Sequence, residues 1–225
     1  MADTTEVYQR GDAYKKERHS LPLRVLAIII SYVFHPAFMP VIMTAVLYKL
    51  VPASFAGVTQ KNIGFILLQV AYHMTFFPLL TVLLLKGLGF IDSIQLKDPR
   101  ERIIPLIATM TFYFWAYWVF RNIESPFILR VLLLGCFLGV VTVFMMNIFF
   151  KISMHTSAAG SMIGILMILL FLSPVNLVLP FFVALLVAGL IGTARMILAA
   201  HASAEIWIGY IAGILVQVAA YLYLR

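Results

Sequence analysis

The sequence predicts an all-α protein, a polytopic transmembrane helical bundle with about six to seven spans. Of its 225 residues, 63% are hydrophobic and only 11% are charged. A water-soluble domain of this size could not bury so much apolar surface. The apolar runs are continuous rather than alternating, which argues against a membrane β-barrel. The only cysteine, Cys136, lies in one of these runs, so an intramolecular disulfide is excluded.

Seven apolar stretches come close to the roughly 20 residues that a membrane-spanning helix needs. They are residues 23–48, 62–86, 103–120, 127–150, 157–173, 176–194 and 206–224. The fifth and sixth are short and are joined by "SPVN", which predicts a tight helical hairpin. No repeat or linker divides the chain, so we expect one membrane-embedded domain over residues 23–225. The polar tail that precedes it, residues 1–22, lacks the apolar segment of a cleavable signal peptide.

Three connections between these spans carry most of the polar side chains. They are residues 86–102, with "KDPRER", residues 151–156, with "KISMHT", and residues 195–205. In a bundle of seven spans these three connections emerge on one face, whereas the other three connections are bland. Topology alone therefore gathers eight residues at one membrane surface: Lys97, Arg100, Arg102, Lys151, His155, Arg195, His201 and Glu205.

This set of residue types suits the chemistry of a phosphate group. Arginine and lysine bind phosphate oxygens, one imidazole can attack phosphorus, and a second can protonate the leaving oxygen. Glu205 follows His201 by four residues, the spacing that places two side chains on one helix face. A carboxylate there would fix the tautomer of the imidazole and stabilise its protonated form.

Helix starts add possible oxyanion sites, because helix N-termini carry partial positive charge and free N–H groups. Asp98 fits an N-cap, Pro99 the first helical position and Glu101 the third, so the third helix is predicted to begin there. The two carboxylates are expected to face Arg100 or solvent. His155 is predicted in the turn before the fifth helix, with Ser157 as a possible cap.

At this point the pattern resembles the type 2 phosphatidic-acid phosphatase superfamily, which also includes the vanadium haloperoxidases. Its signatures are Lys-x6-Arg-Pro, Pro-Ser-Gly-His and Ser-Arg-x5-His-x3-Asp. The third is matched by "ARMILAAHASAE", with Ala194 in place of serine and Glu205 in place of aspartate. The second is "ISMH", which keeps Ser153 and His155. The first is "KDPRERIIP", which keeps Lys97 and Pro105 but has Ile104 in place of arginine.

The resemblance covers about residues 97–213 and implies a helical core of the phosphatidic-acid-phosphatase type. It implies that His201 attacks phosphorus and forms a phosphohistidine, that Glu205 orients it, and that His155 is the general acid. It also implies phosphate binding without a metal or other cofactor, with Arg102 as the candidate substitute for the missing arginine. The implied phosphate-binding residues are Lys97, Arg102, Ser153 and Arg195.

The expected activity is therefore hydrolysis of a phosphoric monoester or diphosphate carried by a membrane lipid. Two alternatives stay open: an inactive lipid-phosphate-binding membrane protein of the same fold, and a small transporter. The net charge of +7 is assigned to loops that meet anionic headgroups rather than to nucleic acid. His35 and His73 are predicted to be packing residues, although His73 could line a substrate groove. Lysine and arginine are nearly balanced between the two faces, so the side of the membrane that carries the site is left open.

Overall fold

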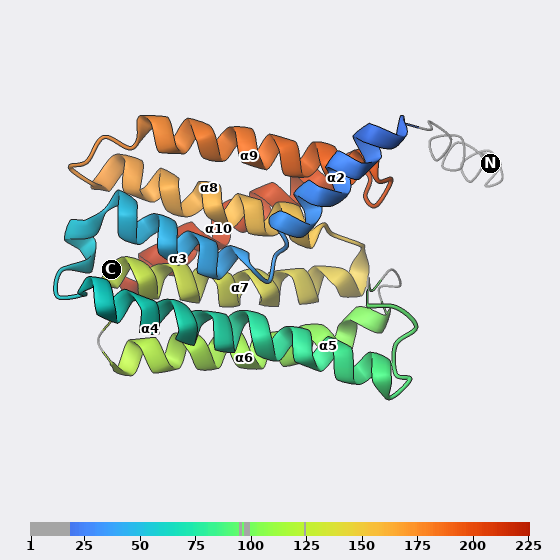
Figure 1. The fold of residues 1–225 in the computed structure, drawn as a ribbon, viewed down its shortest axis with the longest axis horizontal. Helices are drawn as coiled ribbons and strands as arrows, with labels where there is room; N and C mark the ends of the chain where they lie inside the picture. Colours follow the sequence, from blue (N-terminus) through green and yellow to red (C-terminus); the bar gives the residue numbers. More distant parts are fainter. Residues whose placement is uncertain (1–18, 95, 97–99, 124) are drawn as a thin grey trace.

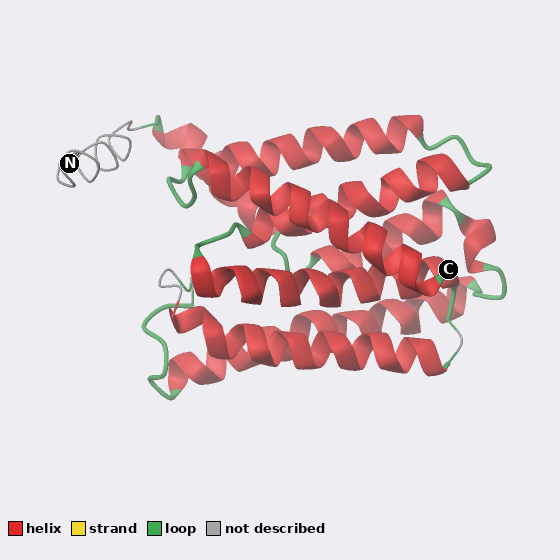
Figure 2. Cartoon of the chain, turned by 180° about the vertical axis from the view of Figure 1, so that it is seen from behind, coloured by secondary structure: helices red, strands yellow, loops and turns green. Residues whose placement is uncertain are grey.

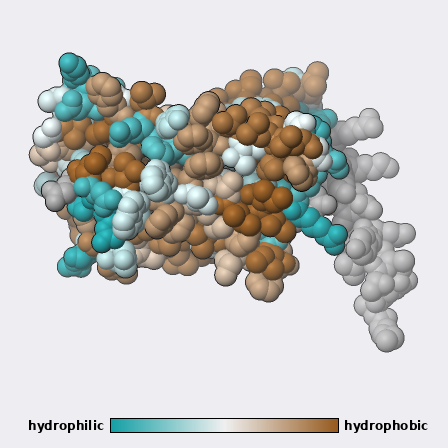
Figure 3. All heavy atoms as spheres, turned by 90° about the horizontal axis from the view of Figure 1, so that it is seen from below, coloured by the Kyte–Doolittle hydropathy of each residue, from teal (hydrophilic) through white to brown (hydrophobic). Residues whose placement is uncertain are grey.

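The computed structural model describes residues 19–94, 96, 100–123 and 125–225, and within these ranges it contains only helices and loops (Figure 2). Six helical stretches are long and apolar enough to cross a membrane: Gln60–Gly87, Arg100–Asn122, Phe127–Phe149, Met154–Leu172, Val178–Ile197 and Ser203–Leu224. Apolar side chains cover much of the middle of the face in Figure 3. The predicted polytopic helical bundle is confirmed.

The prediction of one continuous first span over residues 23–48 is wrong. The segment forms two shorter helices, α2 (Leu21–Val33) and α3 (Met39–Leu50). Pro36 explains the break, because proline has no N–H to donate and disfavours helical geometry at the residue before it. With 13 and 12 residues, each helix is only about 20 Å long, short of the roughly 30 Å hydrocarbon core. In Figure 1 the pair together covers the length that the other crossings cover.

The next crossing contains an irregular turn beside this break. It consists of α4 (Gln60–Ala71), a π-helical turn η2 (Tyr72–Phe76) and α5 (Phe77–Gly87). The hydroxyl of Thr75, in the π turn, donates a hydrogen bond of 2.6 Å to the carbonyl of Ala37. The π turn therefore holds the loop between α2 and α3 by a hydrogen bond to the carbonyl of Ala37, which lies outside both helices.

The remaining crossings are regular. A 3₁₀ turn, η3 (Arg100–Arg102), leads into α6 (Ile103–Asn122), which is followed by α7 (Phe127–Phe149), α8 (Met154–Leu172), α9 (Val178–Ile197) and α10 (Ser203–Leu224). The predicted cap residues Asp98 and Pro99 lie outside the described residues. Glu101 was expected to face Arg100 or solvent; its Oε1 accepts a 2.6 Å hydrogen bond from the N–H of Asp92 at an exposed position.

The start of α8 differs from the prediction by one turn. Ser153 is the N-cap, and its hydroxyl oxygen accepts from the N–H of Thr156 at 3.4 Å. His155 therefore lies in the first turn of α8 rather than before it, and Ser157 is buried inside the helix instead of capping it.

Glycines allow α8 and α10 to pack with their backbones close together. Each helix carries two glycines four residues apart, Gly160 and Gly164 in α8 and Gly209 and Gly213 in α10. A Cβ at Gly213 would overlap the carbonyl of Ser157, and one at Gly160 would overlap the carbonyl of Tyr210. Such small-residue spacing is typical of closely packed membrane helices. The N-terminal turns of α8 and α10 are thereby held side by side.

Residues 88–94, 150–153 and 198–202 lie at one end of the bundle, together with the start of α2, as Figure 1 shows. The connections at residues 51–59, 125–126 and 173–177 lie at the other end. The predicted gathering of the polar connections at one end is therefore present in the fold.

Candidate active site

Arg195, His201 and Glu205 lie on three successive parts of the chain: the end of one helix, a turn, and the start of the next helix. Arg195 lies in the last turn of α9, and the chain then leaves the helix through a Schellman turn. Its two hydrogen bonds run from the N–H of Ala200 to Arg195 and from the N–H of Ala199 to Met196, at 3.1 and 2.8 Å. His201 follows this turn, and Glu205 is in the first turn of α10. The predicted connection 195–205 is thus only residues 198–202.

His201 and Glu205 form a close side-chain pair at this end of the bundle. The imidazole Nδ1 lies 2.6 Å from Glu205 Oε2, and the histidine side chain is only 5% exposed. A carboxylate oxygen accepts, so Nδ1 carries the hydrogen and Nε2 keeps its lone pair. The spacing argument assumed that both residues lie within one helix. His201 instead precedes α10, and the pair still forms.

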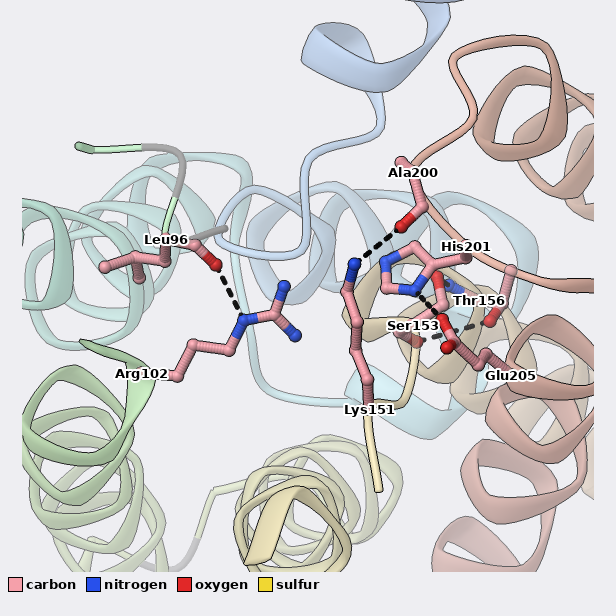
Figure 4. Close-up of polar contacts among 8 residues, drawn as sticks. All are labelled: Leu96, Arg102, Lys151, Ser153, Thr156, Ala200, His201 and Glu205. Carbon is pink, nitrogen blue, oxygen red and sulfur yellow. Dashed lines mark hydrogen bonds and ion pairs between the residues drawn. The ribbon is translucent and has the colours of Figure 1, made fainter. Parts of the chain in front are cut away.

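The surroundings of His201 favour its neutral form. Burial lowers the pKa of His201 to about 3, and the positive charges of three neighbours act in the same direction: Lys151, Arg195 and Arg102. In Figure 4 the Nε2 side of the ring faces Lys151. At neutral pH the ring therefore presents an unprotonated nitrogen to a cationic region, which is the state that a nucleophile needs.

Lys151 is brought into this region by the connection between α7 and α8. Its Nζ donates a 2.9 Å hydrogen bond to the carbonyl of Ala200, the residue before His201. Burial, followed by the charge of Arg102, lowers the pKa of the Lys151 ammonium, whereas Glu205 opposes the shift. The sequence analysis placed Lys151 at this face but assigned it no role. Its position two residues before Ser153, in the second signature, was the sequence feature that could have indicated a role in the site.

Arg102 is turned into the bundle. Its side chain is buried, and its Nε donates a 2.7 Å hydrogen bond to the carbonyl of Leu96. Figure 4 shows the guanidinium pointing toward Lys151. Ile104, at the position where the family has arginine, is 50% exposed on the outside of α6. The position at which the family has arginine thus points away from the site, whereas Arg102 points into it and can supply the cation of this segment.

The carbonyls that hold Arg102 and Lys151 belong to unusual backbone segments. Leu96 has φ of 48°, and Ala199, just before Ala200, also has φ of 48°. Among the described residues these are the two non-glycine residues with positive φ. The left-handed region is uncommon for such residues, and strained backbone tends to occur at functional sites. Both segments adjoin the cations around His201.

Arg195 and His155 form a second group, which contacts α2. Arg195 NH1 donates to the hydroxyl of Ser31 at 3.3 Å, and His155 Nε2 donates to the Ser31 carbonyl at 3.2 Å. The ring of His35 lies edge-on to that of His155, with the centroids 5.4 Å apart. His35, predicted to be a packing residue, therefore packs against a candidate site residue. His73, by contrast, bonds within its own helical segment, with Nδ1 2.8 Å from the carbonyl of Gln69.

Two further residues, Lys97 and Ser153, were predicted to bind phosphate. Lys97 lies outside the described residues. Ser153 is 0% exposed, its hydroxyl oxygen caps α8, and its N–H donates to the carbonyl of Glu205 at 3.4 Å. Ser153 thus joins the starts of α8 and α10, and its role in phosphate binding stays a prediction.

The described part of the site has three cations and one carboxylate. Within it and the rest of the described chain, no group of three His, Cys, Asp or Glu side chains is arranged to hold a metal ion. Comparison of the chain with protein-family models, with curated proteins and with solved structures gives no match.

Proposed function

We propose that this protein is an integral-membrane phosphatase that hydrolyses a lipid phosphate or isoprenoid diphosphate, without a metal ion, through a phosphohistidine at His201. The observation that carries the proposal is the 2.6 Å contact between His201 Nδ1 and Glu205. It directs the free lone pair of Nε2 toward the cations Lys151 and Arg102. A nucleophile, its orienting carboxylate and the counter-charges of a phosphate thus occur together, in a site that resembles the phosphatidic-acid phosphatase superfamily.

The reaction proceeds in two displacements at phosphorus. His201 Nε2 forms a bond to phosphorus as the bond to the leaving oxygen breaks, and His155 gives that oxygen a proton. His155 then takes a proton from water, whose oxygen attacks the phosphohistidine and releases inorganic phosphate. Because Nε2 of His155 already donates to Ser31, the ring carries a transferable proton on Nδ1 only as the imidazolium, the form that a bound anionic substrate favours beside it. Arg102, Lys151 and Arg195 stabilise the charge on the phosphoryl oxygens.

The donor set argues for metal-independent chemistry. Glu205 is engaged by His201. The three cations nearby would repel a divalent ion. We therefore expect activity that survives EDTA and is inhibited by vanadate, a mimic of five-coordinate phosphorus.

A lipid substrate is supported by the position of the site at the ends of crossings. A phosphate bound there would lie at headgroup depth. An apolar groove of about 380 Å³ runs between α7 and α10, and its lining includes Met146, Ile208, Ile211 and Leu215. Ile208 is only three residues from Glu205 along α10. An acyl or isoprenyl chain could lie in this groove while its phosphate is at His201.

The test is phosphate release from a long-chain lipid phosphate by the detergent-purified full chain, with a rapid quench to trap phosphohistidine. His201→Ala should lose at least about 10³-fold in turnover and all trapped phosphohistidine. The matched control is His73→Ala, whose ring bonds to Gln69 and takes no part in the proposed reaction; it should keep near-normal turnover. Retained turnover in His201→Ala would reject the assignment.

An inactive lipid-phosphate-binding protein is the second candidate. It is favoured by one observation, the hydrogen bond that already engages His155 with the Ser31 carbonyl. Vanadate binding without phosphate release from any lipid phosphate would select this alternative. A transporter is less supported: the buried amide of Gln217 donates to the Leu132 carbonyl and fills the contact between α10 and α7.

A further inference from the structure

The break between α2 and α3 makes one backbone carbonyl available at the end of α2. In an uninterrupted helix, the carbonyl of Ser31 would accept from the N–H of His35, four residues later. Here that N–H donates to the carbonyl of Tyr32 instead, at 3.3 Å. The Ser31 carbonyl therefore has room for another donor, and it accepts from His155 Nε2 at 3.2 Å.

The side chain of Ser31 contacts Arg195, the other candidate site residue at the end of α2. Ser31 is 7% exposed, and its hydroxyl oxygen accepts from Arg195 NH1 at 3.3 Å. Arg195 Nε is buried and has no hydrogen-bond partner among the described residues. One face of the guanidinium is thus fixed by α2, while a buried N–H is left for an anion.

The electrostatics of a helix end agree with this arrangement. The last carbonyls of a helix carry partial negative charge, which favours cations and hydrogen-bond donors beside them. Arg195 and His155 occupy that position at the end of α2.

The loop that follows Ser31 is fixed from two sides. His35 Nδ1 accepts from the N–H of Ala37 at 3.3 Å, and the Ala37 carbonyl accepts from Thr75 in the π turn at 2.6 Å. π turns within helices occur frequently at functional sites. The broken first crossing is therefore a defined structure, and it ends at the candidate site.

We propose that Ser31 is a positioning residue of the site, which holds Arg195 through its hydroxyl and His155 through its carbonyl. This inference rests on the proposed function, because it concerns how phosphate is bound there. It extends the site to α2, a helix outside all three sequence signatures. Loss of the hydroxyl should release Arg195 while leaving the carbonyl, and so the contact to His155, in place.

The experiment measures orthovanadate binding to the purified full chain by titration calorimetry, alongside kcat and KM for a lipid phosphate. Ser31→Ala should weaken vanadate binding and raise KM by about 10-fold, the usual effect of a lost hydrogen bond to a charged group, with a smaller change in kcat. Ser31→Thr keeps a hydroxyl and should restore most of the affinity. The matched control is Ser161→Ala, which removes a buried hydroxyl bonded to the Gly213 carbonyl away from the site; its affinity should equal that of the wild type.

Pro36→Ala tests the same idea through the backbone. By allowing α2 to continue, it lets the His35 N–H compete with His155 for the Ser31 carbonyl. Vanadate should therefore bind more weakly, and kcat for a lipid phosphate, whose leaving oxygen needs a proton, should fall. Wild-type affinity in Ser31→Ala and Pro36→Ala would overturn the role of Ser31 and leave the proposed function intact. Absence of both vanadate binding and phosphate release in the wild type would instead overturn the proposed function, and this inference with it.

Discussion

The site has two halves that are built differently. Under the proposed function, the nucleophile half consists of His201, Glu205 and Lys151, and the leaving-group half consists of His155, Arg195 and Ser31. In the nucleophile half, histidine and carboxylate are four residues apart and 2.6 Å from each other. In the leaving-group half, Ser31 contacts residues that are 124 and 164 positions away, at 3.2 and 3.3 Å.

This difference shows which parts of the molecule each half depends on. In the nucleophile half, the pair of His201 and Glu205 is set by one turn between α9 and α10, so this pair should survive changes elsewhere in the bundle; Lys151 reaches it from the connection between α7 and α8. The leaving-group half requires α2, α8 and α9 to keep their places, and α2 is itself a short helix at the surface. Substitutions in the two halves should therefore differ in how much turnover they remove and in whether that loss depends on the leaving group.

The largest effect within this comparison is expected for Glu205→Gln. The amide can donate to Nδ1 and so place the imidazole proton on Nε2, the nitrogen that must attack. We expect turnover to fall by about 10³–10⁴-fold, as in other systems where an orienting carboxylate becomes an amide. Because the defect lies in the attack, the loss should be similar for a lipid alkoxide and for a nitrophenolate leaving group.

The measurement is kcat/KM for both substrate types. Glu205→Asp is the matched control, because it keeps the charge and also restores the acid found in the resembling family. It should retain more activity than Glu205→Gln. Equal activity of the glutamine variant and the wild type would show that the short contact to His201 has no catalytic role.

His155→Ala should give the next largest effect, and here the leaving group should matter. A general acid contributes only when the leaving oxygen needs a proton, so the expected loss is about 10²–10⁴-fold for the lipid substrate and much less for nitrophenolate. His35→Ala serves as the control, because it removes the neighbouring ring while His155 keeps its bond to Ser31. Equal losses of His155→Ala on both substrates would contradict the assigned role and remove the distinction between the two halves.

Arg102→Ala should have a smaller effect, of about 10²-fold in kcat/KM, through lost stabilisation of phosphoryl charge. Arg102→Lys should recover only part of it, since lysine lacks the planar fork that reaches the Leu96 carbonyl and a phosphate together. The exposed Arg100 provides a control of equal charge two residues away, and Arg100→Ala should stay close to wild type. If Arg100→Ala were the more damaging change, the cation of this segment would be misassigned.

The fold and the nucleophile half were largely predictable because both depend on local patterns. Apolar length identifies six crossings, and the four-residue spacing of His201 and Glu205 anticipates their contact. The broken first crossing was missed because the apolar run from residue 23 to 48 hides the effect of Pro36. A His-Pro pair with a second proline, Pro40, four residues later was the signal for that break.

The leaving-group half was only half predictable. His155 and Arg195 follow from motif order, but nothing in the sequence brings Ser31 to them, because a contact across more than a hundred residues is fixed by helix packing. The glycines at 160, 164, 209 and 213 were a usable signal for how α8 and α10 approach each other. The capping role of Ser153 was not predicted, because a serine before a helix fits both an N-cap and an anion ligand.

The smallest expected effect concerns pH and the contact of the nucleophile half with Lys151. Burial and nearby cations lower the pKa of His201 to about 3, so the free protein keeps the nucleophile unprotonated as pH falls through 6.5, where an ordinary histidine gains its proton. The acid limb that His201 sets in kcat/KM, which reports the free protein, should therefore lie far below pH 6.5. Bound phosphate adds negative charge beside the ring and raises its pKa, so the corresponding limb in kcat should lie at higher pH.

Lys151→Met removes one of the cations that disfavour the imidazolium, and the acid limb of kcat/KM should move to higher pH. The shift should be partial, because burial is the larger cause and remains in the variant. Lys49→Met, at the other end of the bundle, changes the net charge equally and should leave the limb where it is. A limb that stays fixed in Lys151→Met, in profiles measured with the lipid substrate at constant ionic strength, would mean that the lysine does not act on His201 and that the nucleophile half is the histidine–carboxylate pair alone.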